Sequence, residues 1–261
     1  MGSRVERGFV RAASTLKAEE TGWKRVSLYG VVTLLLLTLQ KALSTAGSYI
    51  AGSFSYAALD PDHAYAWNAV HHLTMMAFTL LVILALRRRL GVNFGLGLGD
   101  KRAGIRFVSA YTAILAGVSL VVHTLMLVSN ALPAYTYPLS TRNVVGTLGF
   151  QLLLTGPTEE LLYRALPLTI LVCLFGSNKR FTWGITHEGI VAALLFALAH
   201  AKWSLFPLAF DADASQLLYS FAQGIIAAKA YQETRSVIYP MLMHSISNVL
   251  MVGTGYLFLA L

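Results

Sequence analysis

The segment TGPTEELLYR, residues 155–164, places two carboxylates and a guanidinium within an otherwise apolar stretch of the chain. Apolar sequence flanks it from Val144 to Leu154 and from Ala165 to Phe175. A charged side chain at the centre of a membrane helix costs roughly 2.5–3.5 kcal/mol on insertion scales, and such residues mark functional sites by default. The cluster therefore indicates a membrane-embedded segment that carries chemistry.

The spacing of these charged residues predicts one ion pair and one separate carboxylate. Glu160 and Arg164 are four residues apart, so on a helix they share a face and can neutralise each other. Glu159 points about 100° away from Glu160, which leaves it available for another task. The alternative interpretation is a structural ion pair that locks a kinked membrane helix.

Gly156-Pro157 predicts a local break at the start of this motif. Proline is poor in a helix interior but is tolerated in the first turn. We therefore expect Thr155 to cap a helix that begins here, with the two glutamates favourably placed near its N-terminus.

The composition identifies an integral membrane protein. Of 261 residues, 56% are hydrophobic and only 12% are charged, whereas soluble domains carry about 25% charged residues. The formal net charge is +8, but the basic residues gather at the ends of apolar segments, as the positive-inside rule expects. This distribution argues against nucleic-acid binding. The single cysteine, Cys173, excludes an intrachain disulfide and is expected to behave as a small hydrophobe.

The apolar segments predict an all-α, polytopic transmembrane helical bundle of about eight helices around an interior polar cavity. Residues 1–25 form a polar, basic N-terminal tail, and residues 26–261 form a single transmembrane domain with the candidate catalytic motifs in 155–261. A short connection is expected at 202–215. The expected apolar segments cover residues 26–50, 66–86, 105–132, 143–175 (one broken span, or a span with a re-entrant piece), 188–201, 216–231 and 237–261.

Charge bias predicts the orientation of the bundle. Arg87-Arg88-Arg89 ends one apolar segment and marks the inside, whereas the loop 52–65 has no Lys or Arg and should lie outside. The N-terminus is then cytoplasmic, and the cell membrane is the expected location. If the connection 133–142 is outside, Glu159 lies roughly 24 Å along its helix, in the inner half of the bilayer.

Two further patterns in the first half are interpreted as structural. The string Gly97-Leu98-Gly99-Asp100 matches the GxGD motif of intramembrane aspartyl proteases, but no second aspartate lies in an apolar span, so we predict a turn. His71, His72 and His123 lie singly or adjacent in apolar spans, and we interpret each as a hydrogen-bonded core residue.

Polar residues recur in two later apolar segments. Phe196 and His200 are four residues apart in one, and His244 and Asn248 are four apart in the other, so each pair shares a helix face. We expect both pairs to meet the acidic motif inside the bundle, because polar groups find no partners in lipid.

This combination of side chains suits hydrolysis. A carboxylate such as Glu159 can take a proton from water, and an imidazole such as His200 can orient that water or shuttle the proton. His244 and Asn248 can donate hydrogen bonds to a developing oxyanion.

Three other interpretations are open. Glu159, His200 and His244 would make a three-ligand zinc set with an open position, although no HExxH motif is present. We therefore expect no cofactor, with zinc as the open alternative. Carboxylates and imidazoles in neighbouring spans also suit a proton-coupled transporter. The same cluster would only stabilise helix packing in a non-enzymatic immunity or bacteriocin self-resistance protein.

In order along the chain, the patterns EExxxR at Glu159, FxxxH at Phe196 and HxxxN at His244 each fall within a hydrophobic segment. With these motifs the chain resembles the type II CAAX prenyl endopeptidase family, which includes bacterial abortive-infection and bacteriocin-processing relatives. The resemblance runs from the acidic motif to the C-terminus. Each motif is short, but the three in this order are specific.

The resemblance implies a glutamate-dependent intramembrane endopeptidase that cleaves near the C-terminus of CAAX-type proteins or membrane-associated peptides, prenylated ones included. By motif position, Glu159 would be the general base and His200 would help to activate water. His244 and Asn248 would form the oxyanion site. The remaining motif residues would support the acidic motif: Glu160, Arg164 and Phe196. The implied partners are the lipid bilayer and the peptide or protein substrate, with no nucleic acid.

Overall fold

The computed structural model describes residues 22–176, 181–205 and 208–261, and it is mainly helical. Residues 1–21 of the predicted tail lie outside the described residues, and residues 22–25 already belong to the first helix. The helices outside the acidic motif are α2 (Gly22–Ala51), α3 (Ala66–Leu90), α4 (Lys101–Val128), α8 (His187–Ala199), α9 (Ala214–Thr234) and α10 (Ile238–Leu259), with a short 3₁₀ turn η3 at Thr182–Gly184.

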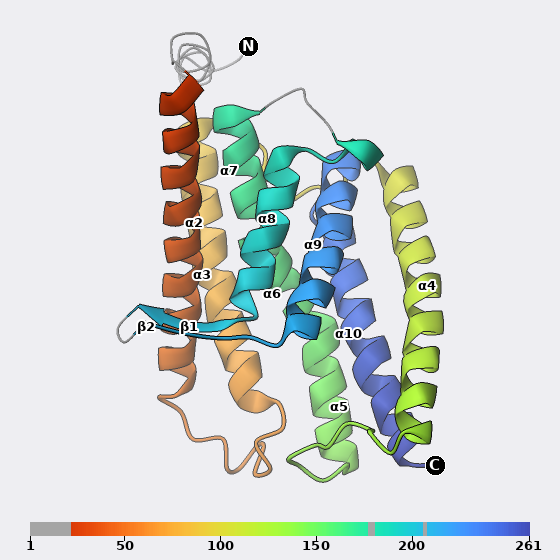
Figure 1. Ribbon diagram of the computed structural model, residues 1–261. Coiled ribbons are helices and arrows are strands. Elements are labelled where there is room, and N and C mark those ends of the chain that lie inside the picture. The colour runs from red at the N-terminus through yellow and green to blue at the C-terminus, as the bar shows by residue number, and fades with distance from the viewer. Residues whose placement is uncertain (1–21, 177–180, 206–207) are drawn as a thin grey trace.

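One continuous helical run carries the acidic motif through the bundle (Figure 1). It passes through α5 (Thr141–Phe150), η1 (Gln151–Thr155), α6 (Gly156–Glu160), η2 (Leu161–Ala165) and α7 (Leu166–Phe175). Helices α3 and α10 pack against α6, and α8 packs against η2 and α7. The acidic motif therefore lies in the interior of an all-α bundle, which confirms the predicted fold class.

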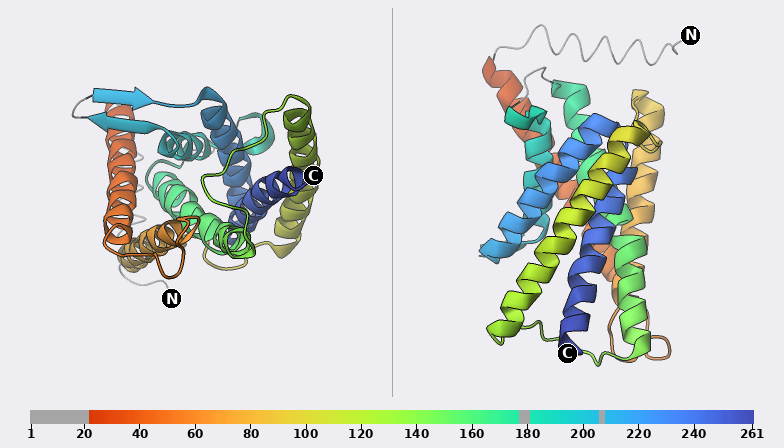
Figure 2. Two further views of the ribbon diagram at one scale, coloured as in Figure 1. Left: turned by 90° about the horizontal axis from the view of Figure 1, so that it is seen from below. Right: turned by 90° about the vertical axis from the view of Figure 1, so that its right-hand side faces the viewer.

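Within the described ranges, four helices are long and apolar enough to cross a membrane, namely α2, α3, α4 and α10, and α8 is a shorter apolar helix. They correspond to the predicted segments 26–50, 66–86, 105–132, 237–261 and 188–201. Figure 2 shows the helices standing side by side. The exact number of spans and the single-domain boundaries stay predictions.

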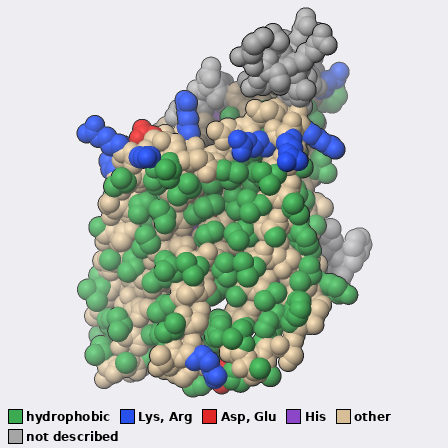
Figure 3. Space-filling view, turned by 180° about the vertical axis from the view of Figure 1, so that it is seen from behind, with side chains coloured by type: hydrophobic (Ala, Val, Ile, Leu, Met, Phe, Trp, Pro, Cys, Tyr) green, Lys and Arg blue, Asp and Glu red, His purple; other side chains and the backbone are tan. Residues whose placement is uncertain are grey.

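Basic side chains collect at one end of the bundle, above a mostly apolar surface (Figure 3). At that end α3 finishes with the exposed residues Arg87, Arg88 and Arg89, and α4 begins with the exposed residues Lys101 and Arg102. This distribution follows the positive-inside pattern, on which the predicted cytoplasmic N-terminus depends.

The helix does not break at Gly156-Pro157, and this prediction was wrong. Instead, the run passes through two π-helical turns, η1 before α6 and η2 after it. Thr155 caps nothing with its side chain, because its hydroxyl donates to the Gln151 carbonyl oxygen at 2.6 Å. A π turn shifts the hydrogen-bond register, which lets the chain pass a proline that has no N–H to donate, and such turns are frequent at functional sites.

The connection predicted at 202–215 contains a β-hairpin instead of a plain loop. Strands β1 (Lys202–Leu205) and β2 (Leu208–Asp211) pair antiparallel, with Trp203 opposite Phe210. The hairpin lies beside α2 in both views (Figures 1 and 2). Because α8 ends at Ala199, His200 is its C-terminal cap rather than a residue within a span.

The GxGD string also has a structural role. Asp100 is the N-cap of α4, and its carboxylate accepts a hydrogen bond from the Ala103 amide at 3.0 Å. Gly99 has a φ of +50°, and a Cβ there would clash with the Thr234 carbonyl oxygen. The string therefore starts a helix and permits a close backbone approach.

One buried carboxylate organises the connection between α2 and α3. Asp60 accepts hydrogen bonds from the amides of Ala64, Tyr65 and Ala66 at 2.9, 2.8 and 2.7 Å. Burial by itself raises the pKa of this carboxyl, but the three bonds and the nearby His63 bring the pKa below its ordinary value of 3.8. The ionised Asp60 therefore stabilises the start of α3.

We expect Asp60→Asn to lower the free energy of unfolding by about 1–2 kcal/mol at neutral pH, because buried amides lose a charged acceptor. Since the pKa is lower in the folded protein, the stabilisation is present above the unfolded pKa and is lost as pH falls through the folded one. Thermal unfolding of both proteins in detergent from neutral to acidic pH measures this effect. An identical pH dependence in the variant would contradict it.

Candidate active site

Glu160 and Arg164 form the predicted ion pair. Arg164 donates from Nε to Glu160 Oε2 at 3.0 Å and from Nη2 to Oε1 at 3.4 Å, and both side chains are fully buried. Arg164 Nη1 also donates to the carbonyl oxygens of Tyr163 and Ala192, at 3.2 and 3.3 Å. The guanidinium lies 4.7 Å from the centroid of the Phe196 ring. The pair therefore ties η2 to α8.

His244 connects the two glutamates from α10. Its Nδ1 donates to Glu160 Oε1 at 2.9 Å, and its Nε2 lies 3.8 Å from Glu159 Oε2. The Phe196 ring packs edge-on against this imidazole, with centroids 5.7 Å apart. Because a carboxylate oxygen can only accept, the Nδ1 proton is committed to Glu160 and Nε2 faces Glu159.

Glu159 is the accessible carboxylate of the motif. Its side chain is 18% exposed, whereas that of Glu160 is 0% exposed. The His72 Nε2 lies 3.3 Å from Glu159 Oε1, and the imidazoles of His72, His200 and His244 all interact electrostatically with this carboxylate. The site thus combines one buried, paired glutamate with one open glutamate surrounded by imidazoles.

His200 approaches Glu159 from the end of α8. Its Nδ1 donates to the Phe196 carbonyl oxygen at 3.0 Å, and the two rings are edge-on with centroids 4.8 Å apart. Since a carbonyl oxygen only accepts, this bond places the proton on Nδ1 and leaves Nε2 as an acceptor. Phe196 therefore orients both predicted imidazoles.

Asn248 lies on α10 near the site, but its donor points to η1. The Nδ2 group donates to Gln151 Oε1 at 3.0 Å and to Thr155 Oγ1 at 3.1 Å. Both amide protons are therefore engaged within the protein. The predicted oxyanion role of Asn248 stays a prediction, and it requires a substrate oxygen to compete with these two acceptors. Gln151 and Thr155 are polar neighbours that the motif analysis did not single out.

The sequence did not single out His72 as a site residue, and the structure places it beside Glu159. It lies on α3, its Nδ1 donates to the Asn68 carbonyl oxygen at 2.9 Å, and its Nε2 faces Glu159. Its ring also packs edge-on against Phe150, with centroids 4.9 Å apart. One general rule would have identified His72: an ionisable residue within a membrane span is by default a candidate functional residue. His123, by contrast, donates to its own helix at the Ser119 carbonyl oxygen, as expected of a core residue.

Residues 141–250 match the family described as type II CAAX prenyl endopeptidase Rce1-like. The resemblance to the type II CAAX prenyl endopeptidase family is thereby confirmed. The matched range contains Glu159, His200, His244 and Asn248, and it excludes α2, α3 and α4. No curated protein and no solved structure matches the chain.

Rce1-like proteins are generally proteases, so the match supports a hydrolase with a peptide substrate in a membrane. The geometry agrees with that class, because an accessible carboxylate lies among three imidazoles. His72 lies outside the matched range and reaches Glu159 from α3.

We expect His72→Phe to reduce kcat for peptide hydrolysis by about ten- to a hundred-fold with little change in KM. Glu159 loses its contact with the His72 Nε2, which donates to the carboxylate when the imidazole carries a proton on both nitrogens. His72→Gln, which retains a donor, should recover part of this loss. His123→Phe, at a buried histidine of α4, is the control and should keep wild-type activity. Equal losses in all three variants would show a structural effect only.

Helix α6 approaches α10 closely at Gly156. A Cβ at this position would clash with the Met241 carbonyl oxygen and the Ser245 hydroxyl. Only glycine therefore permits the helix approach that brings Glu160 to His244. Gly149, earlier in the same helical run, has no heavy atom within 4 Å of an added Cβ.

We expect Gly156→Ala to lower the free energy of unfolding by about 1–3 kcal/mol, because the extra methyl overpacks the interface. Gly149→Ala is the matched control and should be neutral or slightly stabilising, since alanine favours a helix. Thermal unfolding of both variants in detergent measures the difference. A Gly156→Ala protein as stable as the Gly149→Ala protein would contradict the assignment.

The alternative zinc set was tested against the donor geometry. Among the described residues, no group of three or more His, Cys, Asp and Glu side chains is arranged to hold a metal ion. The Nδ1 atoms of His200 and His244 are committed to Phe196 and Glu160, so each imidazole has only Nε2 for a further partner. The expectation of no cofactor stays a prediction, which chelation tests.

Proposed function

We propose that this protein is a glutamate-dependent intramembrane endopeptidase that cleaves near the C-terminus of CAAX-type proteins or membrane-associated peptides, prenylated ones included. The observation that carries the proposal is the unequal environment of the two glutamates. Glu160 is buried and paired with Arg164, whereas Glu159 is partly exposed and surrounded by imidazoles. A carboxylate in that position can accept a proton from a bound water.

The proposed reaction begins with water beside Glu159. Glu159 takes one proton as the water oxygen bonds to the scissile carbonyl carbon, with the His200 Nε2 orienting the water. For the oxyanion that develops, His244 donates from Nε2 in its doubly protonated form, with its Nδ1 proton on Glu160. Asn248 donates once its amide is released from Gln151 and Thr155. Such donors typically contribute 10²–10³-fold in rate. Glu159 then returns its proton to the leaving nitrogen as the C–N bond breaks, so no other reactant is consumed.

The test is cleavage of a farnesylated CAAX peptide by the purified protein in detergent, with and without a zinc chelator. We expect the release of a short C-terminal peptide, identified by mass spectrometry, at the same rate with chelator. An unprenylated peptide of the same sequence measures the contribution of the lipid, and Glu159→Gln is the inactive control. Absence of cleavage of either peptide by folded protein would contradict the proposal and favour the immunity role.

We further propose that the protein is located in the cell membrane with its N-terminus in the cytoplasm, which places the basic end of the bundle inside. The site would then receive a peptide whose lipid stays in the bilayer. Reporter fusions at the Arg142 connection test the orientation, and a cytoplasmic signal there would overturn it.

A further inference from the structure

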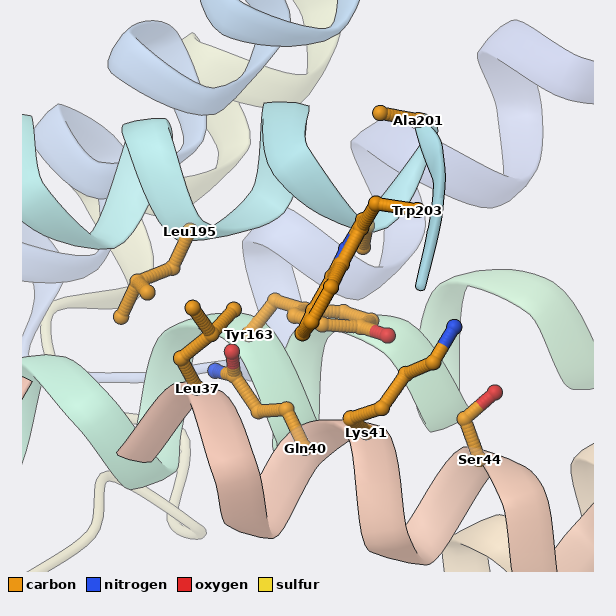
Figure 4. A pocket seen from close by; sticks show the side chains of 9 residues that line it. Leu37, Gln40, Lys41, Ser44, Tyr163, Leu195, Ala201 and Trp203 are labelled. Atoms are coloured by element: carbon orange, nitrogen blue, oxygen red, sulfur yellow. The ribbon is translucent and has the colours of Figure 1, made fainter. Parts of the chain in front are cut away.

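A cavity lined by polar and apolar side chains lies beside the candidate active site, between α2, η2, α8 and β1. Its volume is about 50 Å³. We call it the Lys41 pocket and define it by five lining residues, Gln40, Lys41, Ser44, Tyr163 and Trp203, which Figure 4 shows around one space. The volume suits a small polar group, since a single water needs roughly 10–15 Å³ on the same measure.

The pocket contains a cation with no anionic partner among the described residues. Lys41 is the only charged residue from Val26 to Ala51, and its ammonium lies 5.1 Å from the centroid of the Trp203 ring. The described ion pairs do not include it. An ammonium held over an aromatic face in an otherwise apolar helix is suited to bind an anion.

The pocket also contains a buried acceptor. Gln40 is 2% exposed, and its Nε2 donates to the Leu162 carbonyl oxygen at 3.2 Å. Its Oε1 is buried and has no hydrogen-bond partner among the described residues. Buried acceptors are normally satisfied, so this oxygen calls for an N–H donor within the pocket.

A cation and an unsatisfied acceptor that line the same pocket match one end of a peptide. The C-terminal residue of a peptide presents a carboxylate and an amide N–H that are both attached to the same Cα. Lys41 and the Ser44 hydroxyl can donate to the carboxylate, while Gln40 Oε1 accepts from the amide. An alkyl phosphate would also pair with Lys41, but it carries acceptors and would leave Gln40 unsatisfied.

The pocket is connected to the candidate active site through one layer of side chains. Gln40 bonds to Leu162 within the acidic motif. The Tyr163 ring packs 5.7 Å from the Phe196 ring, measured between centroids, and Phe196 contacts both His200 and His244. A ligand in the pocket therefore lies one layer of side chains, Tyr163 and Phe196, from the residues that would cleave the same chain.

We infer that the Lys41 pocket binds the free C-terminal carboxylate and the adjacent amide of the peptide substrate, and that it thereby selects peptides cleaved close to their C-terminus. This inference rests on the proposed function. It assigns a substrate-selecting role to α2, which lies outside the range matched by the family.

The test compares two prenylated peptides of the same sequence, one with a free C-terminal carboxylate and one with a C-terminal amide. We expect the wild-type kcat/KM to favour the carboxylate peptide by roughly ten- to a hundred-fold. Lys41→Met should bring this ratio close to one, and Lys41→Arg should retain most of it. Lys24→Met, the same change at the start of α2 away from the pocket, should keep the wild-type ratio.

A wild-type ratio near one, or a ratio unchanged in Lys41→Met, would overturn the inference while leaving the proposed function intact. If no peptide is cleaved, the proposed function fails, and equilibrium binding of the two peptides to the Glu159→Gln protein still reports the carboxylate preference. Repeating the measurement in bilayers with and without phosphatidylglycerol distinguishes binding of the peptide carboxylate from binding of a lipid phosphate. Loss of the preference in the anionic bilayer would assign the pocket to a lipid phosphate instead.

Discussion

Glu159→Gln is expected to reduce peptide hydrolysis by about 10²–10⁴-fold, the usual contribution of a positioned general base. The amide matches the carboxylate in shape but cannot take a proton from water. The side chain is partly exposed, so it has room to adjust its contacts with His72 and His244. The variant should therefore fold and lose activity, measured as kcat/KM together with thermal unfolding in detergent.

Glu160→Gln is the matched control for this experiment, because it makes the same change one residue along the chain. Glu160 is fully buried and bonded to both Arg164 and His244, so its replacement should lower the melting temperature markedly. If instead Glu159→Gln lowers stability and retains peptide hydrolysis, the acidic cluster only stabilises helix packing, which is the role that the non-enzymatic interpretation gives to it.

Arg164→Met is expected to lower the free energy of unfolding by about 3–5 kcal/mol, because it leaves the buried Glu160 carboxylate without its cation. The substitution also removes the hydrogen bonds to the Tyr163 and Ala192 carbonyl oxygens and the contact with the Phe196 ring. Since these contacts tie η2 to α8, the position of His200 should be affected and activity should fall with stability.

The double variant Glu160→Gln with Arg164→Met distinguishes the electrostatic contribution of the buried pair to stability from its packing contribution. Removing both partners avoids an uncompensated buried charge, so the double variant should be more stable than the sum of the single losses predicts. Chemical unfolding in detergent of the four proteins gives this coupling energy. Additive losses would show that the pair contributes through packing alone.

Much of the acidic motif could be predicted because its geometry is local. A spacing of four residues on a helix is sufficient to bring Glu160 and Arg164 together, and the structure has this bond at 3.0 Å. The helix face shared by Phe196 and His200 follows in the same way, although His200 is the last, capping residue of α8. The three motifs also indicated a resemblance to the family whose description matches residues 141–250.

Other features could not be predicted because they depend on residues far apart in the chain. His72 reaches Glu159 across 87 positions, and adjacent histidines on an apolar helix give no sign of which one faces the acidic motif. Asn248 shares a helix face with His244, yet its amide bonds to Gln151 and Thr155. Helical periodicity specifies which side chains share a face, and it does not specify which neighbour each will bond.

The sequence by itself determined that this chain is a helical membrane protein with an internal ion pair and a second carboxylate that points away from it. These properties depend on composition and on helical spacing, which act over a few residues. Only the tertiary structure decided how the helix passes Pro157 through two π turns, and how α3 brings His72 to the site. It also placed the β-hairpin beside Lys41. Each of these depends on packing between segments whose approach no local pattern encodes.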